Sequence, residues 1–488
     1  MRCVGRGLNP PLRSRGGMPL YLGVDDTDSL RGMCTTFLAT EFVRTLSAWD
    51  LIGYPRLVRL NPNIPWKTRG NGAICLRLGR GRGRAFPVGA INGQPVRAYP
   101  RCGARASPSD GLVEAVEGVV ETWSEFEDPT TNPAFVLLET PPTPALYWRG
   151  VRGTVTKKEA LAAVRGRGIW REYKNGRGVI GAAAATAWRP RDRTYEVLAY
   201  RHPSRWGTRR TIPRDAVRAL DASFPSTFNN YDSENGRVAV APRTPCPVLC
   251  GIRGDDPREL PAALASLGGE RPDRWLVFET NQGTDDHITR NPREATPGTT
   301  IEVAGTVASH PRTIRGGHVV FPLRWRGAVD VVAYEPSKQF RAIVRALAPG
   351  DRVRVVGAVR ETPRSVNLEK LEVIGLAPLL SKAGNPACFH CGKRMKSSGR
   401  AGPFRCRRCG TRRPRSDAVV VPLPRGISTR WYEPPVGSRR HLSMPLKRSS
   451  PGSRNERVVG RTPRRASPSF SRGADTVPTT ALAFSRAL

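Results

Sequence analysis

The sequence predicts a multidomain α+β protein, and three observations lead to that prediction. Predicted strands and helices alternate over residues 20–138 and again over residues 145–278, which is typical of sheets covered by helices. Five predicted strands then follow between residues 300 and 376, and two Cys-x-x-Cys pairs lie between residues 388 and 409. A chain of 488 residues has room for these units, since one domain takes ~100–150 residues.

The first domain is expected at residues 18–144, with residues 256–292 completing it. Its core helix is indicated by apolar residues at close to helical spacing between Phe37 and Leu46. Prolines at positions 141, 142 and 144 mark its end. The predicted strands are 20–24, 57–60, 73–78, 134–138 and 275–278, and the predicted helices are 35–46 and 111–123.

A second α+β domain is expected at residues 145–255, with a helix at 157–164 and strands at 195–200 and 237–240. It contains a Gly/Ala-rich run at 176–187, which begins GRGVIG, and the segment WGTRR at 206–210. The GRGVIG stretch at 176–181 and the WGTRR segment are basic and flexible in composition, which suits contacts with RNA or phosphate. Arg177 and Arg209 are therefore candidate RNA-binding residues, and ordinary turns are the alternative interpretation.

Residues 296–376 are predicted to form an OB-fold, a small barrel that commonly binds oligonucleotides. The pattern is five strands with one helix between the third and the fourth. The strands are 300–307, 318–324, 329–334, 352–359 and 368–374, and the helix is 338–347. A barrel without nucleic-acid contacts is the alternative.

The net charge of +38 indicates a polyanionic partner, and nucleic acid is the commonest one. An Arg-rich composition without a binding role is the alternative. No stretch approaches the ~18 consecutive apolar residues of a membrane span, and no secretory signal is recognisable. Ten scattered or paired cysteines suit a reducing compartment better than a disulfide framework, so a cytoplasmic location is expected.

An acidic loop follows the first predicted strand and is the candidate catalytic feature. Asp25, Asp26 and Asp28 place three carboxylates within four residues, and these repel one another unless a cation lies among them. Mg²⁺ takes oxygen ligands and often bridges to phosphates. A solvated acidic turn is the alternative. The Gly/Pro-rich loop 61–72 supplies candidate phosphate-binding residues, namely Lys67, Arg69 and Asn71.

The two Cys-x-x-Cys pairs are the most specific local motif. Their spacing lets four thiolates close a tetrahedron around Zn²⁺, with a redox dithiol as the alternative. The predicted ligands are Cys388, Cys391, Cys406 and Cys409. Arg407 and Arg408 lie within the second pair and are further candidates for RNA phosphate contacts.

Several longer motifs resemble one family, the archaeal 2-agmatinylcytidine synthetases of isoleucine tRNA. The resemblance covers about residues 18–448. The motifs, in the family's order, are GVDDTDS at 23–29, RGMCTT at 31–36, NPNIPWKTRGNG at 61–72, GRGVIG at 176–181, STFNNYD at 226–232, PVLCGIR at 247–253, TNQGT at 280–284, WYEPP at 431–435 and RRHLS at 439–443.

The resemblance implies a kinase-like catalytic domain, a ferredoxin-like domain, an OB-fold and a zinc ribbon at residues 386–415. It also implies a tRNA-binding extension at 416–448, where Arg439 and Arg440 are candidate contacts. Residues 449–488 fall outside it, and their Ser/Arg/Pro-rich composition predicts a disordered basic tail.

The implied reaction joins agmatine to C2 of the wobble cytidine in the isoleucine tRNA with a CAU anticodon. In the family, ATP is cleaved to AMP and diphosphate, the C2 oxygen is phosphorylated, and the amine of agmatine displaces the phosphate. Carried over to this chain, Asp25, Asp26 and Asp28 hold metal and ATP, and Thr35 is the phosphorylated threonine, with Thr36 adjacent.

Two cysteines depart from the family pattern. Cys246 and Cys250 stand where an Asp and an aromatic residue are expected, which affects any substrate contact made from that segment. The alternative function is a non-catalytic single-stranded nucleic-acid-binding protein built from an OB-fold and a zinc ribbon. That alternative does not account for the acidic loop or for the ordered motifs before residue 290.

Overall fold

The computed structural model describes residues 17–68, 70–399 and 402–449. Arg69 and the expected tail beyond residue 449 lie outside the described residues. The chain divides into two units at residue 446, and the description below concerns the first of them. Within the described ranges, no helix is long and apolar enough to cross a membrane.

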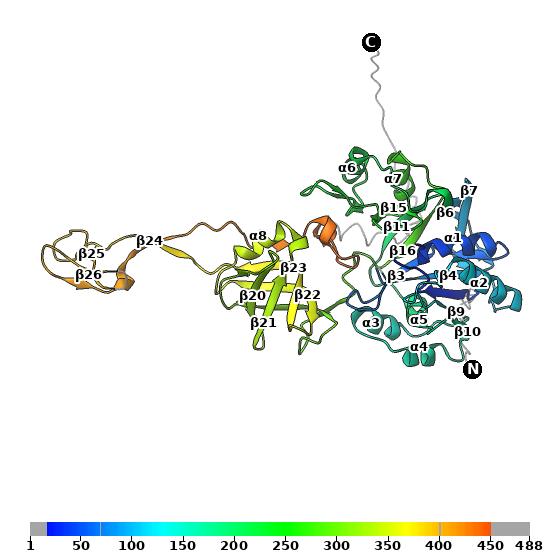
Figure 1. Cartoon of the computed structure of the whole chain (residues 1–488), viewed down its shortest axis with the longest axis horizontal. Helices are drawn as coiled ribbons and strands as arrows, with labels where there is room; N and C mark the ends of the chain where they lie inside the picture. The colour runs from blue at the N-terminus through cyan, green and yellow to red at the C-terminus, as the bar shows by residue number, and fades with distance from the viewer. Residues whose placement is uncertain (1–16, 69, 400–401, 450–488) are drawn as a thin grey trace, which may run out of the picture. The chain divides into compact units, whose positions relative to one another are not determined.

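A mixed twelve-stranded sheet forms the core of the N-terminal part (Figure 1). One half of the main strand order is made of seven strands from residues 20–172. In spatial order they are β10 (Gly168–Glu172), β9 (Ala134–Leu138), β1 (Leu20–Asp25), β4 (Gly72–Gly79), β2 (Asp50–Ile52), β7 (Gln94–Tyr99) and β6 (Phe86–Ile91). The sheet continues through β16 (Arg274–Thr280), β11 (Thr194–Tyr200), β15 (Val248–Gly254) and β12 (Thr227–Phe228). Strand β3 (Arg56–Arg59) joins the halves by pairing with β4 and β16.

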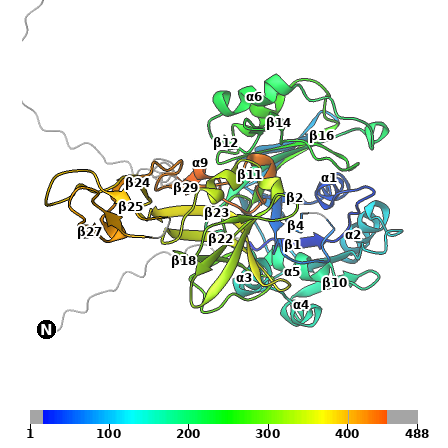
Figure 2. The same ribbon diagram turned by 60° about the vertical axis from the view of Figure 1, so that its left-hand side comes forward.

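Helices cover both faces of the first half because its central strands are apolar on both sides (Figure 2). In β1, Leu20, Leu22 and Val24 face α1 (Thr35–Thr45) and α2 (Asp110–Trp123). In β4, Ala73 and Cys75 face α3 (Pro144–Arg152), α4 (Lys157–Val164) and α5 (Val179–Ala187). Helices α6 (Arg214–Ser223) and α7 (Leu260–Ser266) pack on β11 and β15 in a separate cluster.

The Gly/Ala-rich run forms a buried helix over Val179–Ala187, so the flexible segment expected at residues 176–181 leads directly into a helix. Its small residues allow close approach to β1: a Cβ at Gly23 would lie 2.3 Å from the carbonyl oxygen of Ala182. Only the turn before Val179 keeps the expected loop character. The glycines at 176, 178 and 181 favour a flexible segment, whereas alanine has the highest helix propensity, and the Ala-rich stretch 182–187 is helical accordingly.

The boundary expected at residue 144 falls inside a packed unit. Helices α3 to α5 share one apolar cluster with β4 and β9, and β10 pairs with β9 over residues 168–172. The two expected domains also share one continuous sheet. The segment 144–187 therefore belongs structurally with the first half of the sheet.

The predicted five-stranded barrel is confirmed. Its strands are β18 (Thr300–Val307), β20 (Val319–Arg324), β21 (Ala328–Ala333), β22 (Arg352–Arg360) and β23 (Ser365–Gly375), with α8 (Phe340–Arg345) between the third and fourth. The spatial order β18-β20-β21-β23-β22-β18 closes the barrel around an apolar core. Short strands extend its edges: β17 (Ile288–Arg290), β19 (Arg312–Thr313) and β29 (Trp431–Tyr432).

A small three-stranded sheet carries the Cys-x-x-Cys pairs. It consists of β25 (Lys396–Ser397), β26 (Phe404–Arg405) and β27 (Arg412–Arg413). Cys388, Met395, Phe404 and Cys406 are its buried core. The remaining short elements pair as β24 (Leu380–Gly384) with β28 (Val419–Pro422), β5 (Gly81–Arg82) with β8 (Arg101–Cys102), and β13 (Tyr231–Asp232) with β14 (Arg237–Val238).

Candidate active site

A cavity of about 390 Å³ brings together most of the residues that the sequence singled out. Its walls come from the end of β1, the start of α1, the loop before β4, the turn before α5, β11 and the segment before β15. The predicted residues that line it are Asp25, Asp26, Asp28, Thr35, Lys67, Asn71 and Arg177, and Thr36 lines it as well.

The acidic loop is held in a strained and crowded position. Asp26 has φ of +61°, a left-handed conformation that non-glycine residues rarely adopt and that often occurs at functional sites. Gly181 lies so close to Asp25 that a Cβ there would be 1.8 Å from its carboxylate oxygen. Burial raises the pKa of Asp25 well above its ordinary value, and the charges of Asp26 and Asp28 raise it further.

Arg177, which the sequence suggested as an RNA contact, forms an ion pair with the acidic loop. Its Nε and Nη2 donate to one carboxylate oxygen of Asp26 at 3.2 and 2.9 Å, and Nη2 also donates to the carbonyl of Thr130. Burial raises the pKa of Asp26, while the Arg177 charge opposes that rise. The guanidinium thus offsets part of the repulsion among the carboxylates.

The N-terminus of α1 opens onto the same cavity. Thr35 and Thr36 are the first two helical residues, and both are buried. Thr27 donates a hydrogen bond to the hydroxyl of Thr35 at 3.0 Å, and Tyr200 donates to the carbonyl of Thr36 at 2.9 Å. Among the described residues, no side chain caps this end and no acid lies in its first turn. An uncapped helix N-terminus is suited to binding an anion such as phosphate.

The basic side of the cavity includes Lys67 and a residue that the sequence did not single out, Arg59. Lys67 Nζ donates to the carbonyl of Ile64 at 2.9 Å, and burial and then Arg440 lower its pKa. Arg59 is the last residue of β3, lines the cavity and has a buried Nε with no hydrogen-bond partner in the described part of the chain. Such a donor suits an acceptor brought by a ligand.

Three further cavity residues were missed as members of the site. Glu196 accepts from Arg253 Nε at 3.0 Å, and Arg253 Nη2 lies 3.0 Å from His441 Nδ1. Burial and the charges of Arg59 and Arg253 lower the pKa of His441 well below its ordinary value, so its imidazole is neutral. Arg253 and His441 belong to the PVLCGIR and RRHLS motifs, but sequence spacing gives no sign that these meet.

The two arginines before His441 make internal ion pairs. Arg439 pairs with Glu433 at 3.0 Å and donates to Asn229 Oδ1 at 2.8 Å. Arg440 pairs with Glu369 of β23 at 2.9 Å. Both are half-buried, and their positive charges are largely balanced by these carboxylates. Their contacts hold the segment that carries His441.

The four cysteines form the one group with metal-ligand spacing among the described residues, with their Sγ atoms all within 4.8 Å of one another. Four thiolates at this spacing fit a tetrahedral Zn²⁺. Arg407 and Arg408 are exposed beside them. Within the same described ranges, the carboxylates of Asp25, Asp26 and Asp28 do not form a second such group, so a cation there needs ligands from a bound nucleotide as well.

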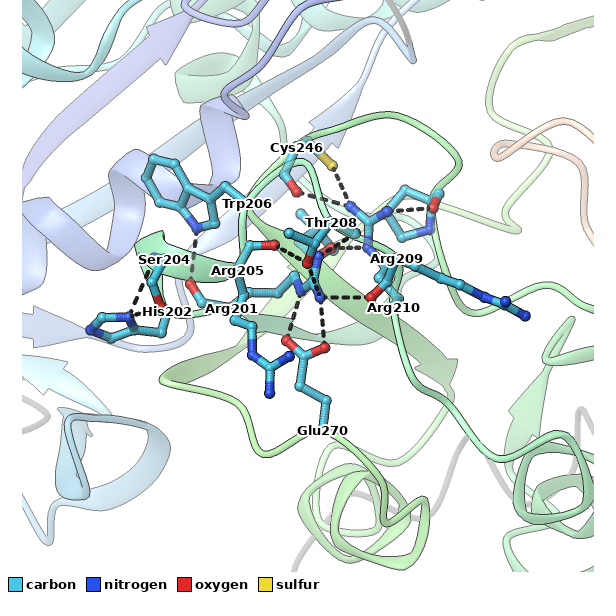
Figure 3. Close-up of polar contacts among 12 residues, drawn as sticks. Arg201, His202, Ser204, Arg205, Trp206, Thr208, Arg209, Arg210, Cys246 and Glu270 are labelled. Atoms are coloured by element: carbon cyan, nitrogen blue, oxygen red, sulfur yellow. Dashed lines mark hydrogen bonds and ion pairs between the residues drawn. The ribbon is translucent and has the colours of Figure 1, made fainter.

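Segment 201–210, which includes the predicted contact Arg209, begins and ends with an arginine that makes several hydrogen bonds (Figure 3). Arg201 is fully buried and pairs with both carboxylate oxygens of Glu270, at 2.6 and 2.7 Å. Arg210 donates to main-chain carbonyls of the segment before β15. The side chain of Arg209 is exposed.

The sheet domain with its charged cavity, the β-barrel and the four-cysteine ribbon make up one multidomain protein, whose cavity has acidic and basic sides that suit a nucleotide. Relatives described as TiaS, the 2-agmatinylcytidine synthetase of an isoleucine tRNA, are 35% identical over 442 residues in Methanocaldococcus jannaschii and 36% identical over 441 residues in Archaeoglobus fulgidus. Each alignment covers 88% of this chain and 98% of the relative. The chain therefore belongs to the TiaS family of tRNA 2-agmatinylcytidine synthetases.

Domain models and solved structures agree with this assignment. The TiaS TCKD domain model matches residues 21–176, the TiaS FLD domain model residues 176–287, and the TiaS C-terminal zinc ribbon model residues 385–427. A complex of TiaS with its isoleucine tRNA and ATP is 34% identical with a TM-score of 0.76, over 91% of this chain and 99% of that one. A complex of TiaS with the same tRNA, AMPCPP and agmatine is 32% identical with a TM-score of 0.73, over 88% and 97%.

Proposed function

We propose that this chain conjugates agmatine to C2 of the wobble cytidine of the isoleucine tRNA with a CAU anticodon, at the expense of ATP. The observation that carries the proposal is the cavity in which the acidic loop, the N-terminus of α1 and the cations Arg59, Lys67 and Arg177 meet. A site of this charge pattern can hold a polyphosphate and a divalent cation together. The relatives' descriptions supply the substrates.

Asp25, Asp26 and Asp28 are proposed to hold Mg²⁺ together with ATP oxygens. The raised pKa of Asp25 supports this assignment, since buried carboxylates that repel one another gain most from a neighbouring cation. The metal would neutralise the charge that develops on the phosphates. Arg59 Nε, Lys67, Asn71 and the first amides of α1 are proposed to donate to the phosphates.

The proposed chemistry has two bond exchanges at the base. The C2 oxygen of the cytidine attacks the terminal phosphorus of the triphosphate, so a C2–O–P linkage forms and the P–O bond between the β and γ phosphorus atoms breaks. Hydrolysis at the α phosphorus releases AMP, and the β phosphorus leaves as inorganic phosphate. The amine of agmatine then attacks C2, the C–O bond breaks, and inorganic phosphate leaves with the oxygen while the amine gives up a proton. Thr35 is the proposed phosphorylated threonine, and its buried hydroxyl lies in the cavity.

The cytidine must leave its stack in the tRNA before its base can enter the cavity. We propose that exposed arginines of the ribbon, Arg407 and Arg408, and Arg209 of the sheet domain contact tRNA phosphates. The four cysteines are proposed to bind one structural Zn²⁺. The names kinase-like and ferredoxin-like for the two halves of the sheet domain, the barrel's role as an OB-fold that binds RNA, and a cytoplasmic location belong to the same proposal.

The test is the dependence of ATP cleavage on its co-substrates. With purified protein, release of AMP should require both agmatine and the isoleucine tRNA. ATP cleavage that is indifferent to agmatine would contradict the proposal. Binding of single-stranded RNA without any ATP cleavage would instead support the alternative of a non-catalytic nucleic-acid-binding protein.

A further inference from the structure

The guanidinium of Arg210 donates hydrogen bonds to four main-chain carbonyls at the edge of the cavity. Arg210 Nε donates to the carbonyl of Val248 at 2.8 Å and Nη1 to that of Pro242 at 3.0 Å. Its Nη2 donates to the carbonyls of Thr244 and Cys246, both at 2.9 Å (Figure 3). All three guanidinium nitrogens are therefore committed to one short segment, 242–248, which is irregular until β15 begins at Val248.

Segment 242–248 is a wall of the cavity, whereas Arg210 is not. Pro242, Thr244, Cys246 and Val248 all line the cavity, and Arg210 holds each of them through its main-chain carbonyl. Residues 242–246 are irregular and have no sheet partners for their carbonyls, and buried carbonyls need donors. The fork of Arg210 supplies them, so this side chain determines the shape of the wall without touching a ligand.

The segment that carries Arg210 is itself rigid. Arg201 donates to the carbonyls of Thr208 and Arg209 at 2.7 and 3.1 Å, in addition to its pair with Glu270. Trp206 donates to the carbonyl of Arg201 at 3.0 Å, and its ring packs edge-on against Phe37 of α1, with 5.3 Å between the ring centroids. Arg210 is thus fixed relative to the helix that bears Thr35 and Thr36.

The chemistry of the wall indicates which substrate depends on it. Ala239, Val240, Ala241, Pro242 and Val248 give this wall an apolar character, in contrast to the charged loop and helix end that suit ATP. Agmatine has a hydrocarbon chain between its two cationic ends, and such a chain is stabilised by apolar contact. The triphosphate of ATP and the tRNA backbone have no corresponding apolar part. The adenine and cytosine rings do have apolar faces, so the KM for ATP is the measurement that separates a contact with adenine from one with agmatine.

We propose that Arg210 is a positioning residue for agmatine, because it holds segment 242–248 in the shape that receives the hydrocarbon chain. This inference rests on the proposed function. Lysine at position 210 keeps the positive charge but presents one nitrogen in place of the planar fork, so it cannot bridge four carbonyls. The wall then loses its fixed shape while the acidic loop and the start of α1 are unchanged.

The test compares Arg210→Lys with Arg205→Lys, the same substitution at an exposed arginine of the same segment. Among the described residues, the Arg205 side chain makes no hydrogen bond to the wall. In Arg210→Lys, the KM for agmatine at saturating ATP and tRNA should rise about tenfold, equivalent to about 1.4 kcal/mol, while the KM for ATP changes less than about twofold. Arg205→Lys should keep both KM values.

Each result decides the inference. An unchanged agmatine KM in Arg210→Lys overturns it, and so does a parallel loss of ATP binding, since that would show a general folding role. A purely structural role lowers the active fraction, and therefore kcat, without changing KM. If the wild-type protein fails to incorporate agmatine at all, the proposed function fails first, which distinguishes the two failures.

Discussion

Arg177 and Asp26, 151 residues apart in the sequence, are joined by two hydrogen bonds from one guanidinium to one carboxylate oxygen. The pair ties the turn before α5 to the acidic loop after β1. Because the pair joins opposite charges, it lowers the electrostatic cost of placing acidic and basic groups around one cavity. Glu196, Arg59 and Arg253 line the same cavity.

Replacement of Arg177 by Met should lower kcat/KM for agmatine incorporation by at least about tenfold, since the partly buried Asp26 loses its counter-charge. Arg177→Lys should restore part of the activity because it restores the charge without the fork. Steady-state kinetics of both variants at saturating tRNA provide the measurement. Equal activity of Arg177→Met and wild type would contradict the role of the pair.

Changing Asp25, Asp26 or Asp28 singly to Asn should abolish agmatine incorporation while leaving tRNA affinity largely intact. Each change removes a charge from the proposed ATP and Mg²⁺ site but does not alter the exposed arginines that are proposed to contact RNA. The assay pairs labelled-agmatine incorporation with tRNA binding. Near-normal turnover in all three variants would reject the acidic loop as the catalytic feature.

Gly181→Ala should impair catalysis because its Cβ would lie 1.8 Å from the Asp25 carboxylate and must displace it. Gly118→Ala in α2 is the matched control, since a Cβ there meets nothing within 4 Å. The control should be neutral, or stabilise the fold by up to about 1 kcal/mol through helix propensity. Turnover and the thermal unfolding temperature should be measured for both variants, and Gly181→Ala should have the lower turnover. Equal turnover in the two variants would argue against crowding at Asp25.

Stability should depend on pH through Asp286, whose pKa is raised to about 6 by burial, against the hydrogen bond from Tyr147. The native state binds this proton more tightly than the unfolded state. Unfolding free energy should therefore fall as pH rises from about 4 to about 6, by up to about 3 kcal/mol. Asp286→Asn should flatten this slope in denaturant titrations, and an unchanged slope would assign the pH dependence elsewhere.

Cys406→Ser should remove zinc and unfold the ribbon, because structural zinc contributes on the order of 10 kcal/mol to such small units. ATP binding should survive, since the cavity contains none of the four cysteines. Elemental analysis tests the metal, and tRNA affinity at several salt concentrations tests the contact through Arg407 and Arg408. A wild-type protein without zinc would contradict the metal assignment, and an unchanged salt slope would contradict only the RNA contact.

Much of the fold follows from local sequence patterns. Short apolar runs predicted β1, β4 and most barrel strands to within a few residues, and the cysteine spacing predicted the ribbon. Helix α5 was not predicted because the glycines before it were given more weight than its alanines. The boundary at residue 144 did not follow because α3 to α5 pack in one apolar cluster with β4 and β9. Such packing is a tertiary property that composition does not encode.

The site was predictable only in part for a similar reason. Asp25, Asp26 and Asp28 are close together in sequence, so their charge pattern is visible without a structure. Arg59, Glu196 and His441 come from three distant segments, and nothing in their local spacing indicates that they meet. Arg177 was singled out for its basic, glycine-rich surroundings, but its partner became evident only from the contact with Asp26.

The most direct test of the proposed reaction combines the purified protein with the CAU-anticodon isoleucine tRNA transcript, ATP, Mg²⁺ and labelled agmatine. Label should appear in the wobble nucleotide alone, with AMP released in step with incorporation. Tight tRNA binding without any label in the tRNA would contradict it and would favour a protein that binds RNA without modifying it.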